Sequence, residues 1–110
     1  MEISTKDMKR VSLVTVAGRV DSATAPDFEK ALQSLIQANR NQIVLDLNGV
    51  DYMSSAGIRG MVSSLKAAKG GGGDLRLAQP STRVKEVLEL AGLHSIFAVY
   101  DSLIEAVGSF

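Results

Sequence analysis

The sequence predicts an α/β fold with a mixed, mostly parallel sheet of four to five strands, an antiparallel opening hairpin and about four helices. Stretches with strand periodicity alternate with stretches of helical periodicity, as in sheets whose parallel strands are joined by right-handed helical crossovers. The chain has 110 residues, of which 45% are apolar and 22% charged. That composition is typical of a globular domain with one core. We therefore expect residues 1–110 to form a single domain.

The charge balance and the lack of cysteine exclude several classes of protein. Twelve basic and twelve acidic residues give no formal net charge, so the basic stripe that nucleic-acid binding requires is missing. Without cysteine there are no disulfides, thiolate catalysis or cysteine-ligated metals. The first ten residues lack the apolar core of a signal peptide, and no apolar run approaches the roughly 20 residues that span a bilayer. We expect a cytoplasmic protein that binds neither nucleic acid nor membrane.

Two stretches in the first half have the pattern of strands. Residues 11–17 alternate apolar and polar side chains, which predicts a strand with one buried face, and we expect Gly18 to end it. Residues 2–5 can pair with this strand as a hairpin. Residues 43–47 are almost continuously apolar, as expected of a central strand that is covered on both faces or at least well buried.

Helical periodicity follows each of these strands. Either Asp21 or Thr24 is expected to cap the first helix, which runs to about Asn39. A second helix is expected from Gly57, and the glycines at 70–73 stop it. The apolar positions of the two helices are Phe28, Ala31, Leu32, Leu35 and Ile36, then Ile58, Met61, Val62, Leu65 and Ala68.

The last third repeats the alternation of strand and helix. Residues 75–78 and 96–100 have the pattern of short strands. Pro80 and Ser81 open a third helix that Gly92 ends, and residues 101–102 cap a fourth. The apolar positions of these helices are Val84, Val87, Leu88 and Ala91, then Leu103, Ile104, Ala106 and Val107.

The inventory of reactive residues argues against an enzyme. His94 is the only histidine, so only a serine–histidine pair could support nucleophilic catalysis, and the serine turn at 53–57 lacks the G-x-S-x-G elbow of hydrolases. The glycine run at 70–73 follows a helix and carries no phosphate-binding motif, which favours a turn. We interpret the acidic residues at strand ends as solvated or capping, and not as metal ligands: Asp46, Asp51 and Asp74.

Adjacent serines, Ser54 and Ser55, stand at the junction between a strand and a helix. One of them is expected to cap the helix, a contribution of about 1 kcal/mol. Gly57 and Gly60 cost helix stability, so the face of small side chains around them predicts a surface that must approach closely. That surface can belong to a partner or to this chain's own neighbouring strand.

A phosphate on Ser55 would suit this position in the fold. It would add about −1.5 to −2 units of charge at a helix N-terminus, where the macrodipole favours an anion, and Arg59 lies one turn further on. The fold should therefore tolerate the modification. At a docking surface, a dianion that faces acidic or apolar groups of the partner costs repulsion and desolvation, which gives a binary switch without refolding.

Three segments carry a family resemblance: VAGRVD at 16–21, IVLDL at 43–47 and VDYMSSAGI at 50–58. They closely resemble the STAS domain of bacterial anti-sigma factor antagonists, and the match covers essentially the whole chain. The resemblance implies the STAS fold over residues 1–110.

In this family the motif commonly reads Asp-Ser, then Ser or Thr, then Gly. The first hydroxyl is phosphorylated by an ATP-dependent serine kinase that doubles as the anti-sigma factor, and Ser55 matches its position. The resemblance implies that the unphosphorylated chain binds the kinase and frees a sigma factor, that phosphorylation breaks the complex, and that a PP2C-type phosphatase restores it. It implies no cofactor, and we expect a monomer or weak dimer. The implied docking surface comprises Asp21, Ser22, Met53, Ser54, Gly57, Arg59 and Gly60.

Two departures from the motif leave alternatives open. Ser54 stands where the family often has aspartate, and Ala56 where it often has a second hydroxyl. A variant kinase, or modification of Ser54 itself, would accommodate them. Two other functions also remain: a STAS scaffold subunit of a lipid-transport or sensor complex, in which Ser55 only caps the helix, and a small hydrolase or nucleotide-binding enzyme, which the inventory supports least.

Overall fold

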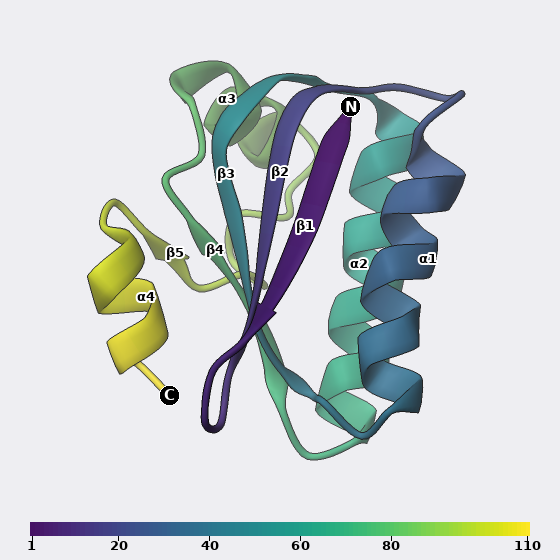
Figure 1. The fold of residues 1–110 in the computed structure, drawn as a ribbon. Helices are drawn as coiled ribbons and strands as arrows, with labels where there is room; N and C mark the ends of the chain where they lie inside the picture. The colour runs from purple at the N-terminus through teal and green to yellow at the C-terminus, as the bar shows by residue number, and fades with distance from the viewer.

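The computed structural model describes residues 1–110 and contains one five-stranded sheet in the order β1-β2-β3-β4-β5. β1 pairs antiparallel with β2, and the other neighbouring strands are parallel. The predicted fold class and opening hairpin are confirmed. The strands are β1 (Glu2–Asp7), β2 (Ser12–Val20), β3 (Gln42–Met53), β4 (Asp74–Ala78) and β5 (Val99–Tyr100). The helices are α1 (Ala25–Gln37), α2 (Ser55–Gly70), α3 (Thr82–Leu90) and α4 (Leu103–Gly108) (Figure 1).

Helices lie on both faces of the sheet. α1 and α2 run side by side along one face, and α4 lies on the other (Figure 1). The larger core lies under α1 and α2 and includes Phe28 and Met61. The smaller core joins Val44 of β3 to Ala106 of α4. Residues 43–47 are buried throughout, as predicted for a central strand covered on both faces.

Two strands are longer than the sequence pattern indicated. Gly18 does not end β2: it adopts φ 91°, the register shifts between Gly18 and Arg19, and the strand continues to Val20. A glycine in this conformation is typical of a bulge. β3 continues beyond Leu47 to Met53. The extensions matter for the site because they make Val20 and Met53 partners at the same edge of the sheet.

The helices and the last strand show smaller differences. α2 begins at Ser55, two residues before Gly57. Ala91 is exposed, because it is the C-cap residue of α3 and not part of its buried face. Ile104 is also exposed. The last strand is limited to Val99–Tyr100, although Phe97 just before it is buried in the core.

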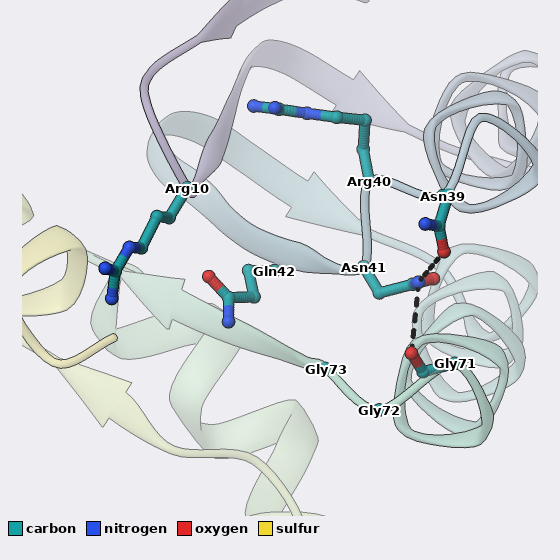
Figure 2. A pocket seen from close by; sticks show the side chains of 8 residues that line it. All are labelled: Arg10, Asn39, Arg40, Asn41, Gln42, Gly71, Gly72 and Gly73. Atoms are coloured by element: carbon teal, nitrogen blue, oxygen red, sulfur yellow. Dashed lines mark hydrogen bonds between the residues drawn. The ribbon is translucent and has the colours of Figure 1, made fainter.

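The glycine run forms the turn from α2 to β4, as predicted. The N–H groups of Gly71, Gly72 and Gly73 donate to carbonyl oxygens in the last turns of α2, so they are not free to bind phosphate. A side chain at Gly73 would collide with the main chain of Asn41. Beside this turn lies a polar pocket of about 230 Å³ at the amino-terminal ends of β3 and β4 (Figure 2).

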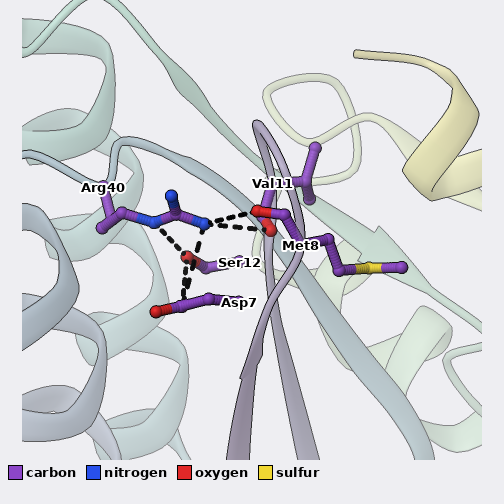
Figure 3. Close-up of polar contacts among 5 residues, drawn as sticks. All are labelled: Asp7, Met8, Val11, Ser12 and Arg40. Atoms are coloured by element: carbon purple, nitrogen blue, oxygen red, sulfur yellow. Dashed lines mark hydrogen bonds and ion pairs between the residues drawn. The ribbon is translucent and has the colours of Figure 1, made fainter.

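Arg40 fixes the β1–β2 hairpin to the turn between α1 and β3. Its guanidinium donates to Ser12 Oγ at 3.0 Å and to the carbonyl oxygens of Met8 and Val11 at 2.9 and 3.2 Å (Figure 3). Ser12 Oγ in turn donates to Asp7 Oδ1 at 3.1 Å. The tip of the hairpin is therefore held by charge-assisted hydrogen bonds.

Candidate functional site

The candidate site is built where the parallel strands β2 and β3 end. Val20 pairs with Met53 in the register, and the Ser54 N–H donates to the Val20 carbonyl oxygen at 2.7 Å. Both strands therefore finish at one edge of the sheet. The loop from β2 to α1, with Asp21 and Ser22, emerges beside the start of α2.

Ser54 caps α2. Its extended backbone, with φ −79° and ψ 170°, and its Oγ, which accepts a 3.3 Å hydrogen bond from Gly57 N–H, have the usual geometry of an N-cap. Its carbonyl oxygen accepts the first helical hydrogen bond, from Ile58 N–H at 3.0 Å. The sequence predicted a serine cap at this junction, and the structure assigns it to Ser54.

Ser55 is the first residue of α2 and is exposed. Its hydroxyl forms no hydrogen bond within the chain, in contrast to the capping hydroxyl of Ser54. The stability of the fold therefore does not depend on the Ser55 hydroxyl, which is open to a reagent or a partner.

The two buried glycines of α2 lie where this helix packs against neighbouring elements of the chain. A Cβ on Gly57 would lie 2.8 Å from Val20 Cγ1 and 3.0 Å from Met53 Cγ, and one on Gly60 would lie 3.4 Å from Glu29 Cβ of α1. Gly57, Gly60 and Met53 are all buried. The small side chains therefore let α2 approach β2 and α1, and the assignment of these buried residues to a docking surface stays a prediction.

Asp21 organises the loop before α1. Its Oδ1 accepts hydrogen bonds from the N–H groups of Ala23 and Thr24 at 3.0 and 3.1 Å. The bond from the Thr24 N–H is the main cause that holds the Asp21 pKa below its usual value; the Thr24 hydroxyl, the Ala23 N–H and the charge of Arg19 lower this pKa further. Thr24 makes no side-chain cap to α1. Ser22 lies exposed in this loop.

Two arginines, Arg19 and Arg59, lie exposed near the site. Arg59 is exposed, one turn after Ser55, and forms no ion pair within the chain. Arg19 stacks on the ring of Tyr52, with its guanidinium carbon 4.3 Å from the ring centroid, a favourable cation–π geometry.

A groove of about 520 Å³ begins beside Arg59 and follows α2. Sequence reasoning missed this groove, because Leu93, which closes it, comes from the loop after α3 and only the tertiary fold brings it to α2. The lining residues are Ile58, Arg59, Val62, Ser63, Lys66 and Leu93.

The enzyme alternative depends on a serine close to His94. His94 is exposed in the loop after α3 and lines a separate pocket that includes no serine. No group of three or more histidine, cysteine, aspartate or glutamate residues is placed to hold a metal ion. None of the helices combines the length and the apolar character needed to cross a bilayer.

Comparisons with known proteins agree on one family. A family model described as the STAS domain matches residues 2–106. BtrV of Bordetella bronchiseptica, a candidate anti-sigma factor antagonist, is 32% identical over all of this chain and 95% of its own length. The anti-sigma-B factor antagonist of Staphylococcus aureus is 29% identical over 90% of this chain and 92% of its own.

The fold comparison gives the same result. The crystal structure of a candidate anti-sigma factor antagonist from Thermotoga maritima superposes with a TM-score of 0.91 at 26% identity. The superposition covers 97% of this chain and 92% of that one.

Proposed function

Because this chain belongs to the STAS domain family and to its anti-sigma factor antagonists, we propose that it is the binding component of a partner-switching pathway. Its unphosphorylated form binds a serine-kinase anti-sigma factor, and this binding releases the sigma factor. Phosphorylation of Ser55 ends the complex. The chain acts by binding and not by catalysis.

The single observation that supports Ser55 as the switch is that the hydroxyls of the two adjacent serines differ in their hydrogen bonding. Ser54 provides the helix cap, and Ser55 presents an exposed hydroxyl with no partner in the chain. A kinase can therefore modify Ser55 without disrupting a contact that stabilises the fold. The same reasoning disfavours Ser54, whose modification would remove the cap.

The phosphoryl transfer itself requires only the kinase and ATP. Ser55 Oγ attacks the γ-phosphorus of ATP, the bond from that phosphorus to the β,γ-bridging oxygen breaks, ADP leaves, and the hydroxyl proton passes to a base of the kinase. A PP2C-type phosphatase then hydrolyses the phosphoserine to serine and inorganic phosphate. The kinase and the phosphatase are thus the two partners of the cycle.

The effect of the phosphate falls on the docking surface. It adds about −1.5 to −2 units of charge at the N-terminus of α2, where the helix tolerates it. Ser22, Ser55 and Arg59 are exposed, and we propose that they contact the kinase directly. Asp21 and Ser54 hold the loop and the helix start, and the buried Met53, Gly57 and Gly60 support them from beneath.

The test is phosphosite mapping with purified protein, ATP and a serine-kinase anti-sigma factor from the same organism. We expect one phosphate on Ser55, none on the Ser55→Ala variant, and unchanged incorporation in Ser63→Ala, which removes another exposed serine of α2. Intact-mass spectrometry with fragmentation reads both the number and the position of the phosphates.

An unmodified chain, alongside a control substrate that the same kinase phosphorylates, would overturn the proposed switch. A phosphate on Ser54 would move the switch to the neighbouring residue. Retained partner binding without any phosphorylation would instead indicate a scaffold subunit.

A further inference from the structure

β1 is an edge strand of the sheet, and one side of it has no neighbour. The Met8 N–H donates to the Val11 carbonyl oxygen at 2.8 Å, which fixes the alternation in the antiparallel pair. Because successive residues of a strand point their main-chain groups to opposite sides, the even-numbered residues of β1 face β2. The N–H and C=O groups of the odd-numbered residues 3, 5 and 7 therefore point outward.

The side-chain hydrogen bond between Asp7 and Ser12 agrees with this alternation. These residues are directly opposite in the register, and Ser12 Oγ lies 3.1 Å from Asp7 Oδ1. Side chains approach most closely in the pairs that exchange no main-chain hydrogen bonds. Asp7 is thus among the residues whose main-chain groups face away from β2.

The side chains of β1 carry unpaired charges of both signs on one face. The Ile3 side chain packs against the larger core. The side chains of the even-numbered residues of β1 therefore lie on the opposite face of the sheet. Glu2, Ser4 and Lys6 are all exposed. Neither Glu2 nor Lys6 forms an ion pair within the chain.

We propose that this edge pairs with β1 of a second copy of the chain, antiparallel about a two-fold axis at Ser4. Ile3 then lies opposite Thr5 of the second copy, and the two symmetric pairs exchange about four main-chain hydrogen bonds. Glu2 of each copy lies opposite Lys6 of the other copy, so the interface contains two such pairs. The interface is isologous, as in most dimers of identical chains.

Charge and hydrogen-bond geometry together select this register. A register centred on Thr5 also joins outward-facing groups, but it places Lys6 opposite Ser4 and leaves Glu2 without a cation. A shift by a single residue would oppose outward-facing to inward-facing groups and form no ladder. Charged residues commonly protect edge strands, and here their pattern is complementary to itself.

This dimer is independent of the proposed switch. α2 packs over β3 and β4, whereas the pairing uses the free edge of β1, so Ser55 stays open in both copies. The hairpin is already ordered by Arg40, which limits the entropy lost on pairing. The small contact predicts a weak association.

The test is sedimentation equilibrium of the full chain over a wide concentration range. We expect the average mass to rise reversibly from 11.7 kDa toward twice that value. Lys6→Glu or Glu2→Lys alone should weaken the association by about tenfold, because like charges then lie opposite each other. The double charge swap should restore it to within about threefold of the original, whereas Lys9→Glu in the adjacent turn should have no effect.

A second variant tests the main-chain ladder directly. Thr5→Pro removes an outward-facing N–H that has no partner in the monomer, a position where an edge strand tolerates proline. It should therefore fold normally and lose the association. A chain that stays monomeric at all concentrations would overturn the proposal, and so would a dimer indifferent to the charge reversals or to Thr5→Pro.

Discussion

The Ser54 N–H donates a 2.7 Å hydrogen bond to the carbonyl oxygen of Val20. This bond ties the end of β3 to the end of β2, and the side chain of Ser54 caps α2. Ser54 therefore both joins the ends of the two strands and caps the helix. The next residue, Ser55, is positioned by both elements but supports neither with its hydroxyl.

Ser54→Ala is expected to lower the free energy of unfolding by about 1 kcal/mol, the usual contribution of a serine cap. Ser55→Ala is the matched control and should change it by less than about 0.5 kcal/mol, because its hydroxyl makes no bond in the chain. Urea denaturation followed by circular dichroism measures both. An equal loss in the two variants would contradict the assignment of the cap to Ser54.

Alanine substitutions at the two buried glycines of α2 should have opposite signs. At Gly57 the new Cβ would lie 2.8 Å from Val20 Cγ1, and overpacking typically costs about 1–3 kcal/mol. At Gly60 the nearest atom would be Glu29 Cβ at 3.4 Å, an ordinary contact. There the better helix propensity of alanine should stabilise the fold by up to about 1 kcal/mol.

Thermal unfolding of both alanine variants measures this difference. If both variants are stabilised, the Val20 side chain of β2 shifts to accommodate the new methyl group with no loss of stability. Two destabilised variants would mean that α1 and α2 already pack too closely at Gly60 to accept a methyl group.

Asp21 should make stability depend on pH. Its pKa is lowered in the folded state, chiefly by the hydrogen bond from the Thr24 N–H, so its contribution is present above the unfolded-state pKa of about 3.9. It is lost as the pH falls through the lower folded-state pKa. Asp21→Asn should therefore lower the melting temperature at pH 7, and the difference from wild type should shrink in acid.

The control for this effect is Asp51→Asn, which removes an exposed carboxylate that makes no hydrogen bond in the chain. Melting curves at a series of pH values compare the three proteins. A difference between wild type and Asp21→Asn that stays constant down to the most acidic pH would show that the charge of Asp21 contributes nothing.

The sequence pattern was sufficient for the fold because periodicity reports burial directly. The run at 43–47 predicted a strand covered on both faces, and those residues are all buried. Strand ends were predicted less well. Gly18 reads as a breaker, yet its φ of 91° lets β2 bulge and continue, because pairing with β3 outweighs the local preference of glycine.

The candidate site was predictable only in outline. The junction of strand and helix was visible in the pattern, but either serine could have capped the helix, since the choice depends on how Ser54 meets Val20 across the sheet. The small-residue face had two explanations, and only the contacts in the folded chain show that packing leaves no room for a Cβ at Gly57 and leaves room for one at Gly60. The groove beside α2 needs Leu93, which no local pattern connects to Ile58.

The sharpest prediction for the proposed switch is Ser55→Asp. The carboxylate should weaken binding to the serine-kinase anti-sigma factor by about a hundredfold or more. Repulsion by a like charge of the partner, or desolvation of the new charge in the interface, costs several kcal/mol. The melting temperature should hardly change, because an anion is tolerated at the first position of α2. Isothermal titration calorimetry measures the affinity, and thermal unfolding measures the melting temperature.

The control variant is Ser95→Asp, in an exposed loop after α3, which adds the same charge elsewhere and should bind the kinase with normal affinity. Wild-type affinity in Ser55→Asp, with Ser95→Asp unchanged, would show that a negative charge at this position does not control the complex.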